Sequence, residues 1–121
     1  MIDRSQLSTD QLIDRFERCA VEQGDAFDYS LITRVNRLID ELVELEAELK
    51  RREPDQRSAL IPLLTHKHVN VRFRSALALL AVATEEAREA LQNIVALKRY
   101  PQTADAIRML RSLDEGRYVP N

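Results

Sequence analysis

The chain has 121 residues and a mass of 14.0 kDa, and its formal net charge is −2. Hydrophobic residues make up 45% of the sequence and charged residues 31%, which argues against a disordered chain and predicts one globular domain over residues 1–121. No apolar run reaches the roughly 20 residues of a membrane helix, and one cysteine excludes an internal disulfide, so we expect no membrane association and a cytoplasmic location.

The sequence contains only two glycines and four prolines, which favours helices throughout. The first predicted helix follows Ser8, which stands three residues before Gln11, as in a capping box. We expect this helix to end near Gly24. Its apolar positions follow helical spacing and predict a buried face of Leu12, Phe16, Cys19, Ala20 and Gln23.

A long second helix is predicted over residues 29–52. Its apolar residues alternate in steps of four and three, in the order Leu31, Val35, Leu38, Leu42, Leu45 and Leu49. This seam resembles a coiled coil and allows a homodimer. Because Ile32 and Ile39 widen the apolar stripe, packing within the molecule is the favoured interpretation.

Shorter helices are predicted in the rest of the chain, where prolines, turn residues and capping residues divide the sequence. In order, we expect one helix from Pro54 to Leu64, a turn at 66–70, a helix ending at Ala83, a helix capped by Thr84 and a helix from Pro101 to Gly116.

The last four predicted helices form two similar pairs. Residues of the two pairs match at offsets of 31 and then 30: Leu60 with Leu91, Leu63 with Ile94, Leu64 with Val95, Ala76 with Ala106, Leu77 with Ile107 and Leu80 with Leu110. Repeated helix pairs bury their apolar faces by stacking on one another. The prediction is an all-α fold, a short irregular α-solenoid of about six helices in three antiparallel pairs. Its parts are a helix pair over 1–53, two pairs over 54–116 and a tail over 117–121.

The stretch "LLTHKHVNVRFRSALAL" resembles a HEAT repeat, in which two leucines, a turn, a Val-Arg pair and small or leucine residues follow one another. The matching residues are Leu63, Leu64, Val71, Arg72, Ala76 and Leu79. The turn departs from the pattern, because HEAT units commonly have prolines and an acidic cap where this chain has Lys67, His68 and Val69. The whole layout, with "VNRLIDELVELEAELK", "YPQTADA" and "LRSLDEGRYVP", is similar to a bacterial family of short HEAT-like proteins known only as a domain of unknown function. This resemblance implies an all-helical fold and no established activity.

The charged residues divide unevenly along the chain. Residues 1–53 have 8 basic and 13 acidic side chains, whereas residues 54–121 have 10 and 7. Between Lys50 and Arg74 there are 7 basic residues and 2 acidic ones, and this basic segment contains the candidate binding residues Arg51, Arg52, His66, Lys67, His68 and Arg74. They form one basic edge if the end of the second helix meets the "HKH" turn. The alternative is a solvated edge whose cations complement the negative end of a helix.

Arg72 has a different expected role. In HEAT repeats the matching arginine pairs with an acidic side chain of a neighbouring helix or turn, so the resemblance implies that Arg72 is structural. The planar guanidinium suits such a pair.

No catalytic set is recognisable in the sequence. His66 and His68 have no third metal ligand nearby, although a catalytic zinc site usually takes three protein ligands. There is no glycine-rich phosphate loop and no nucleophile elbow. We therefore expect no metal, no cofactor and no enzymatic activity.

The sequence predicts a module that binds another macromolecule, most plausibly a protein, through an exposed groove or edge. Two alternatives stay open. One is binding of nucleic acid or phosphate through the segment from Lys50 to Arg74, although the overall acidity weighs against it. The other is an immunity-type or adaptor protein with one cognate partner.

Overall fold

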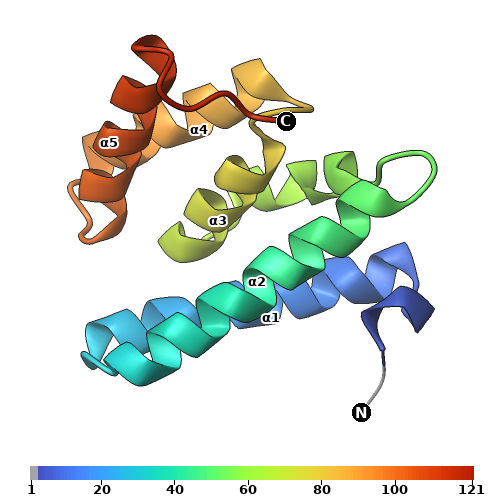
Figure 1. The fold of residues 1–121 in the computed structure, drawn as a ribbon. Helices are drawn as coiled ribbons and strands as arrows, with labels where there is room; N and C mark the ends of the chain where they lie inside the picture. The colour runs from blue at the N-terminus through green and yellow to red at the C-terminus, as the bar shows by residue number, and fades with distance from the viewer. Residues whose placement is uncertain (1–2) are drawn as a thin grey trace.

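A computed structural model describes residues 3–121 (Figure 1). The elements in chain order are the 3₁₀ helix η1 (Arg4–Gln6), α1 (Thr9–Asp28), α2 (Ile32–Arg51), the 3₁₀ helix η2 (Arg57–Thr65), α3 (Val69–Leu79), α4 (Thr84–Leu97) and α5 (Gln102–Asp114). No strand occurs within this described part of the chain. The predicted all-α fold is therefore confirmed. Within the same residues, no helix is both long enough and apolar enough to cross a membrane.

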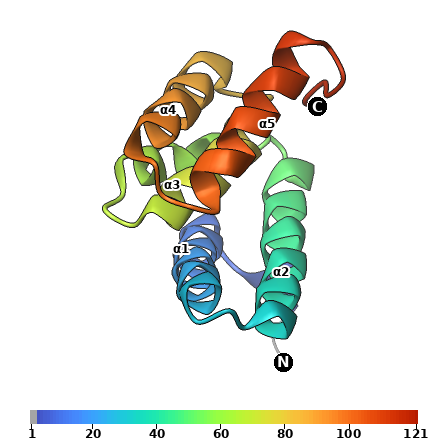
Figure 2. The same ribbon diagram turned by 90° about the vertical axis from the view of Figure 1, so that its left-hand side faces the viewer.

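Consecutive helices pack as pairs, namely α1 with α2, η2 with α3, and α4 with α5. Helix α3 also contacts α1 and α4, so it lies at the centre of the molecule, between the first pair and the last (Figures 1 and 2). One core cluster runs from Leu7 to Ala106 and includes residues of all five α-helices. Every pair thus shares the same core.

Helix α1 begins as the sequence predicts. The Ser8 hydroxyl accepts a hydrogen bond from the Gln11 backbone N–H (3.1 Å), and the Gln11 side chain accepts one from the Ser8 N–H (2.8 Å). The five residues predicted to form its buried face are all buried. The predicted end near Gly24 is wrong, because the helix continues to Asp28. A Cβ at Gly24 would lie 2.4 Å from Cε1 of His68, so this glycine allows a close approach rather than stopping the helix.

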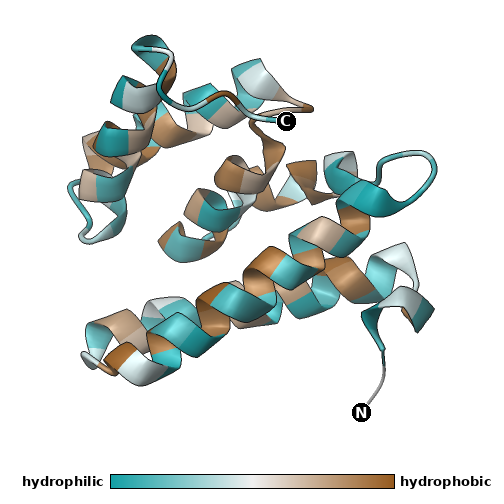
Figure 3. Ribbon diagram, viewed as in Figure 1, coloured by the Kyte–Doolittle hydropathy of each residue, from teal (hydrophilic) through white to brown (hydrophobic). Residues whose placement is uncertain are grey.

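Helix α2 packs its leucine seam inside the molecule, as favoured from the sequence. Val35, Leu38, Leu42, Leu45 and Leu49 are buried. Figure 3 shows apolar and polar residues alternating along this helix, which is the pattern of an amphipathic helix with one face in the core. Leu31, the first residue of the predicted seam, precedes the helix and is 48% exposed.

The element after α2 differs from the prediction. It begins at Arg57 instead of Pro54, and it is a 3₁₀ helix with Pro62 inside. Proline has no N–H to donate and its ring obstructs the preceding α-helical turn, which favours tighter 3₁₀ turns. The predicted cap at Thr84 is also wrong. Ala83 occupies the N-cap position, and the Thr84 hydroxyl donates back to the Leu80 carbonyl (2.7 Å).

The two C-terminal pairs share much of their core pattern. Leu60 and Leu91 are fully buried at matching positions, and so are Ala76 and Ala106. The match weakens on the second helix of the last pair, where Ile107 is exposed. The HEAT-like solenoid stays a prediction.

Candidate functional site

Three buried side-chain amides connect α1, α3 and α5. Asn70 is 0% exposed and its Nδ2 donates to the Ala20 carbonyl (2.7 Å) and to Oε1 of Gln23 (3.0 Å). Its Oδ1 accepts from Nε2 of Gln102 (3.0 Å). We call Gln23, Asn70 and Gln102 the amide ladder. The sequence predicted that Gln23 is buried but did not indicate its partners. Asn70 lies 47 residues after Gln23, and Gln102 lies 32 residues after Asn70.

Three connections lie on one side of the molecule, and the amide ladder joins the helices that follow the last two of them. Residues 29–31 join α1 to α2, residues 66–68 join η2 to α3, and residues 98–101 join α4 to α5. Asn70 and Gln102 lie just after the second and third of these connections. In Figure 1 the first and third connections are both at the left, the side on which α3 begins. We call these three segments the turn edge.

The two histidines of the turn edge are occupied by the protein itself. Nδ1 of His66 accepts the backbone N–H of His68 (3.0 Å), which leaves the proton on Nε2 to donate to Oε2 of Glu17 (2.7 Å). Nδ1 of His68 caps α3 by accepting from the Asn70 N–H (3.3 Å), and its Nε2 lies 3.6 Å from Asp25. Residues 3–121 contain no group of three metal-ligating side chains. Both imidazoles therefore fasten the second connection to α1.

The free cations of the turn edge are Lys67, Lys98 and Arg99. All three are exposed, and none forms an ion pair among the described residues. Tyr100 beside them is 64% exposed. Sequence reasoning named Lys67 and missed the other two. The repeat offset of 31 could have found them, because it aligns Lys67 with Lys98 and His68 with Arg99.

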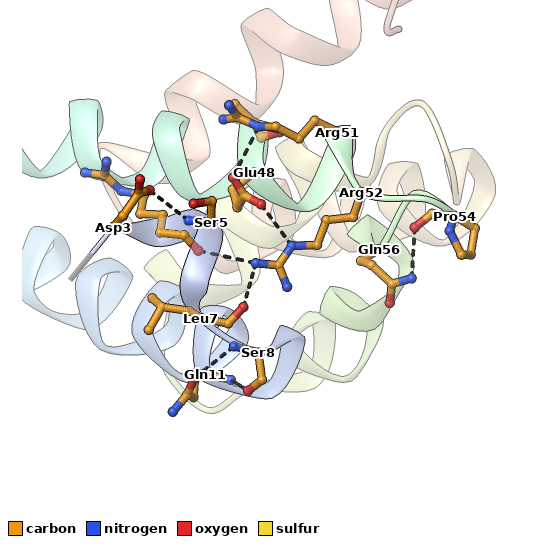
Figure 4. A network of polar contacts seen from close by, with 12 residues as sticks. Asp3, Ser5, Leu7, Ser8, Gln11, Glu48, Arg51, Arg52, Pro54 and Gln56 are labelled. Atoms are coloured by element: carbon orange, nitrogen blue, oxygen red, sulfur yellow. Dashed lines mark hydrogen bonds and ion pairs between the residues drawn. The ribbon is translucent and has the colours of Figure 1, made fainter.

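Arg51 and Arg52 lie at the end of α2, away from the turn edge, and both contact other residues of the protein (Figure 4). Nε of Arg52 donates to the buried Glu48 carboxylate (2.9 Å), and its Nη2 donates to the Leu7 carbonyl (2.6 Å). Nε of Arg51 lies 3.3 Å from the same carboxylate. These contacts tie the end of α2 to the segment before α1, a structural role.

The condition for a single basic edge, that these arginines meet the "HKH" turn, is not fulfilled. Arg52 contacts Leu7, just before α1, whereas His68 faces Asp25 near the other end of α1. The 17 residues from Thr9 to Asp25 span about 25 Å of helix. The basic segment therefore does not form one edge.

Arg72 lacks the acidic partner that the HEAT resemblance implies, since it forms no ion pair with any residue in 3–121. Its Nε is buried without a hydrogen-bond partner. The expected ion pair is wrong.

Arg74 is not at the turn but inside α3, where its Nε is also buried without a partner. Burial lowers the pKa of this guanidinium, while the nearby charge of Glu46 on α2 acts in the opposite direction. Burial also raises the pKa of the Glu46 carboxyl. An unsatisfied buried donor costs about 1–3 kcal/mol, so Arg74 is a costly residue for the fold to keep.

Cys19 lies in the core, as predicted, and Sγ donates to the Leu38 carbonyl (3.5 Å). Burial raises the pKa of its thiol to about 11. A thiol with this pKa is almost fully protonated at neutral pH and makes a poor nucleophile.

Comparisons with known proteins place the chain in a family. Residues 10–114 match the model of a family described as a domain of unknown function, DUF2019. The chain is 40% identical to the protein RPA1889 from Rhodopseudomonas palustris CGA009, whose crystal structure it matches over 100% of both chains with a TM-score of 0.95. No curated protein matches. Because the family model covers most of its length, the chain belongs to the DUF2019 family.

Proposed function

We propose that this protein is a non-enzymatic binding module that takes an acidic segment of a partner protein at its turn edge. In this proposal the stacked helix pairs act as a short HEAT-like solenoid, which presents its connections on a rigid frame. The supporting observation is the set of three exposed, unpaired cations Lys67, Lys98 and Arg99 next to the exposed Tyr100.

The side chains of the turn edge suit a protein partner. Tyrosine and arginine are enriched at protein interfaces. The first connection adds Tyr29, which is 76% exposed, and the apolar Leu31. An acidic segment with one or two apolar residues would complement both parts of this surface, the cations by charge and the apolar residues by burial.

The same cations support a nucleic-acid partner less well than a protein partner. Three of the five arginines in the segment from Lys50 to Arg74 are paired with carboxylates: Arg51 and Arg52 with Glu48, and Arg57 with Asp55. The three free cations of the turn edge, on a chain of net charge −2, form a small footprint for a phosphate backbone.

Fluorescence anisotropy with defined probes tests the proposal. The probes are a peptide of alternating glutamate and phenylalanine, the same peptide with lysine for glutamate, and a single-stranded DNA of equal charge. The edge variant is Lys67→Glu with Arg99→Glu. The control variant, Arg37→Glu with Lys50→Glu, changes the charge equally at exposed, unpaired positions of α2.

We expect the glutamate peptide to bind the wild type and the control variant, and to bind the edge variant roughly tenfold more weakly, which is about 1.4 kcal/mol. The lysine peptide should not bind. Equal affinity for the two variants would refute the turn edge as the site, and tighter binding of the DNA would replace the acidic segment with nucleic acid.

A further inference from the structure

A pocket lies between α3 and α5. It has a volume of about 330 Å³, and its lining comprises Phe73, Arg74, Leu77, Asp105, Arg108, Met109 and Ser112. This volume falls at the lower end of the range of small-molecule sites. None of its residues belongs to the turn edge.

Arg74 is the unusual group in this pocket. It forms no hydrogen bond and no ion pair with any residue in 3–121, and its Nε is buried. Buried guanidinium groups in proteins normally satisfy their donors. The negative charges of Glu46 and Asp105 favour the charged form of the Arg74 guanidinium, but neither residue forms an ion pair with it. The fold therefore keeps a partly buried cation, with an unpartnered Nε, beside an open pocket.

We infer that this pocket binds a carboxylate attached to an apolar stem, with Arg74 as the carboxylate-binding residue. An arginine presents parallel N–H donors that match the two oxygens of a carboxylate. The Ser112 hydroxyl adds a further donor at the pocket wall, and Phe73, Leu77 and Met109 provide apolar surface for the stem.

The remaining charges favour a single negative charge. Asp105 pairs with Arg108, so the three charged residues that line the pocket carry one net positive charge. The Arg108–Asp105 pair is at the surface, where ion pairs are weak, so Arg108 can turn toward a bound anion. Glu46 on α2 adds a negative charge near Arg74, which weighs against a dianionic phosphate.

The carboxylate can come from a free organic acid or from the C-terminus of a peptide, and separate probes distinguish them. We would titrate the protein with octanoate, with octanol and octyl phosphate as its controls, and with a short peptide that ends in a free C-terminal leucine, with its C-terminal amide as control. Heteronuclear NMR of the arginine Nε–H and methyl signals reports where each probe binds. The variants are Arg74→Gln, which removes the charge, and Leu77→Trp, which fills the pocket and keeps Arg74. Arg72→Gln is the matched control, because Arg72 also has a buried, unpartnered Nε but does not line this pocket.

We expect saturable shifts at the Arg74 Nε–H and the Met109 methyl with one carboxylate probe and not with its uncharged counterpart. Binding should weaken at least roughly tenfold in both pocket variants and persist in Arg72→Gln. Absence of shifts with both carboxylates up to about 10 mM, which would detect a Kd near 1 mM, overturns the inference even if Arg74→Gln unfolds. So does tighter binding of octyl phosphate, or unchanged binding in the folded Leu77→Trp variant.

Discussion

Replacing Asn70 by alanine tests whether the amide ladder holds the helix pairs together. The substitution removes three hydrogen bonds, to the Ala20 carbonyl, Gln23 and Gln102, from a side chain that is 0% exposed. At about 1 kcal/mol for each hydrogen bond, the loss is about 3 kcal/mol. The two amide groups left buried without their partner add to it, so we expect the free energy of unfolding to fall by about 3–4 kcal/mol. That is a large part of the stability of an ordinary domain.

Urea unfolding followed by circular dichroism measures this loss. The control is Asn36→Ala on the exposed side of α2, which should change the free energy of unfolding by less than about 0.5 kcal/mol. Gln102→Ala and the double variant complete a cycle, and we expect a coupling energy of about 1 kcal/mol between Asn70 and Gln102. A loss below about 1 kcal/mol for Asn70→Ala, or a coupling energy near zero, would refute the reasoning that the ladder joins α3 to α5.

Four further substitutions test three separate parts of the structure. Gly24→Ala should destabilise the protein by about 1–3 kcal/mol in urea unfolding, because the new methyl group would lie 2.4 Å from an imidazole carbon; a stabilised variant would contradict this close approach. Arg52→Ala should lower the free energy of unfolding by about 2–3 kcal/mol, because it leaves a buried carboxylate and two backbone carbonyls without their main donor. Arg51→Ala should lower it by less than about 1 kcal/mol, because Arg51 is an exposed partner of the same carboxylate. Equal losses in the two variants would contradict this difference. The raised pKa of Glu46 means that its contribution to stability is favourable below its unfolded value of 4.5 and is lost as the pH rises through the folded value. Glu46→Gln should therefore raise the thermal midpoint of unfolding at pH 7 and leave it unchanged well below pH 4.5. Calorimetry across this pH range measures the midpoint, and a midpoint that falls at pH 7 would contradict the prediction.

Local signals in the sequence predicted most of the helices. The capping box at Ser8 and the leucine seam of α2 are read from spacings of three and four residues, and the structure has both. The predicted end of α1 was wrong because a glycine in a helical segment has two physical explanations: it can end the helix, or it can allow a close contact with another side chain. Only the position of His68, far along the chain, decides between them.

The candidate site was harder to predict, because charge composition does not show which cations are already paired. Arg52 looked like a binding residue in the sequence, yet its donors are used by Glu48 and by backbone carbonyls 45 and 48 residues away. Lys98 and Arg99 were not predicted as binding residues, although the repeat offset aligns Lys98 with Lys67 and Arg99 with His68. Repeats therefore held more information about the surface than the count of basic residues did.

The 3₁₀ form of η2 has a consequence for the length of the central helix pair. A 3₁₀ helix rises about 2.0 Å per residue, so the nine residues of η2 extend about 18 Å. The eleven residues of α3 extend about 16.5 Å at 1.5 Å per residue. An α-helix of nine residues would reach only about 13.5 Å, which is about 3 Å shorter than α3. The two elements of the central pair are therefore similar in length, and their nine and eleven residues are fewer than those of either other pair.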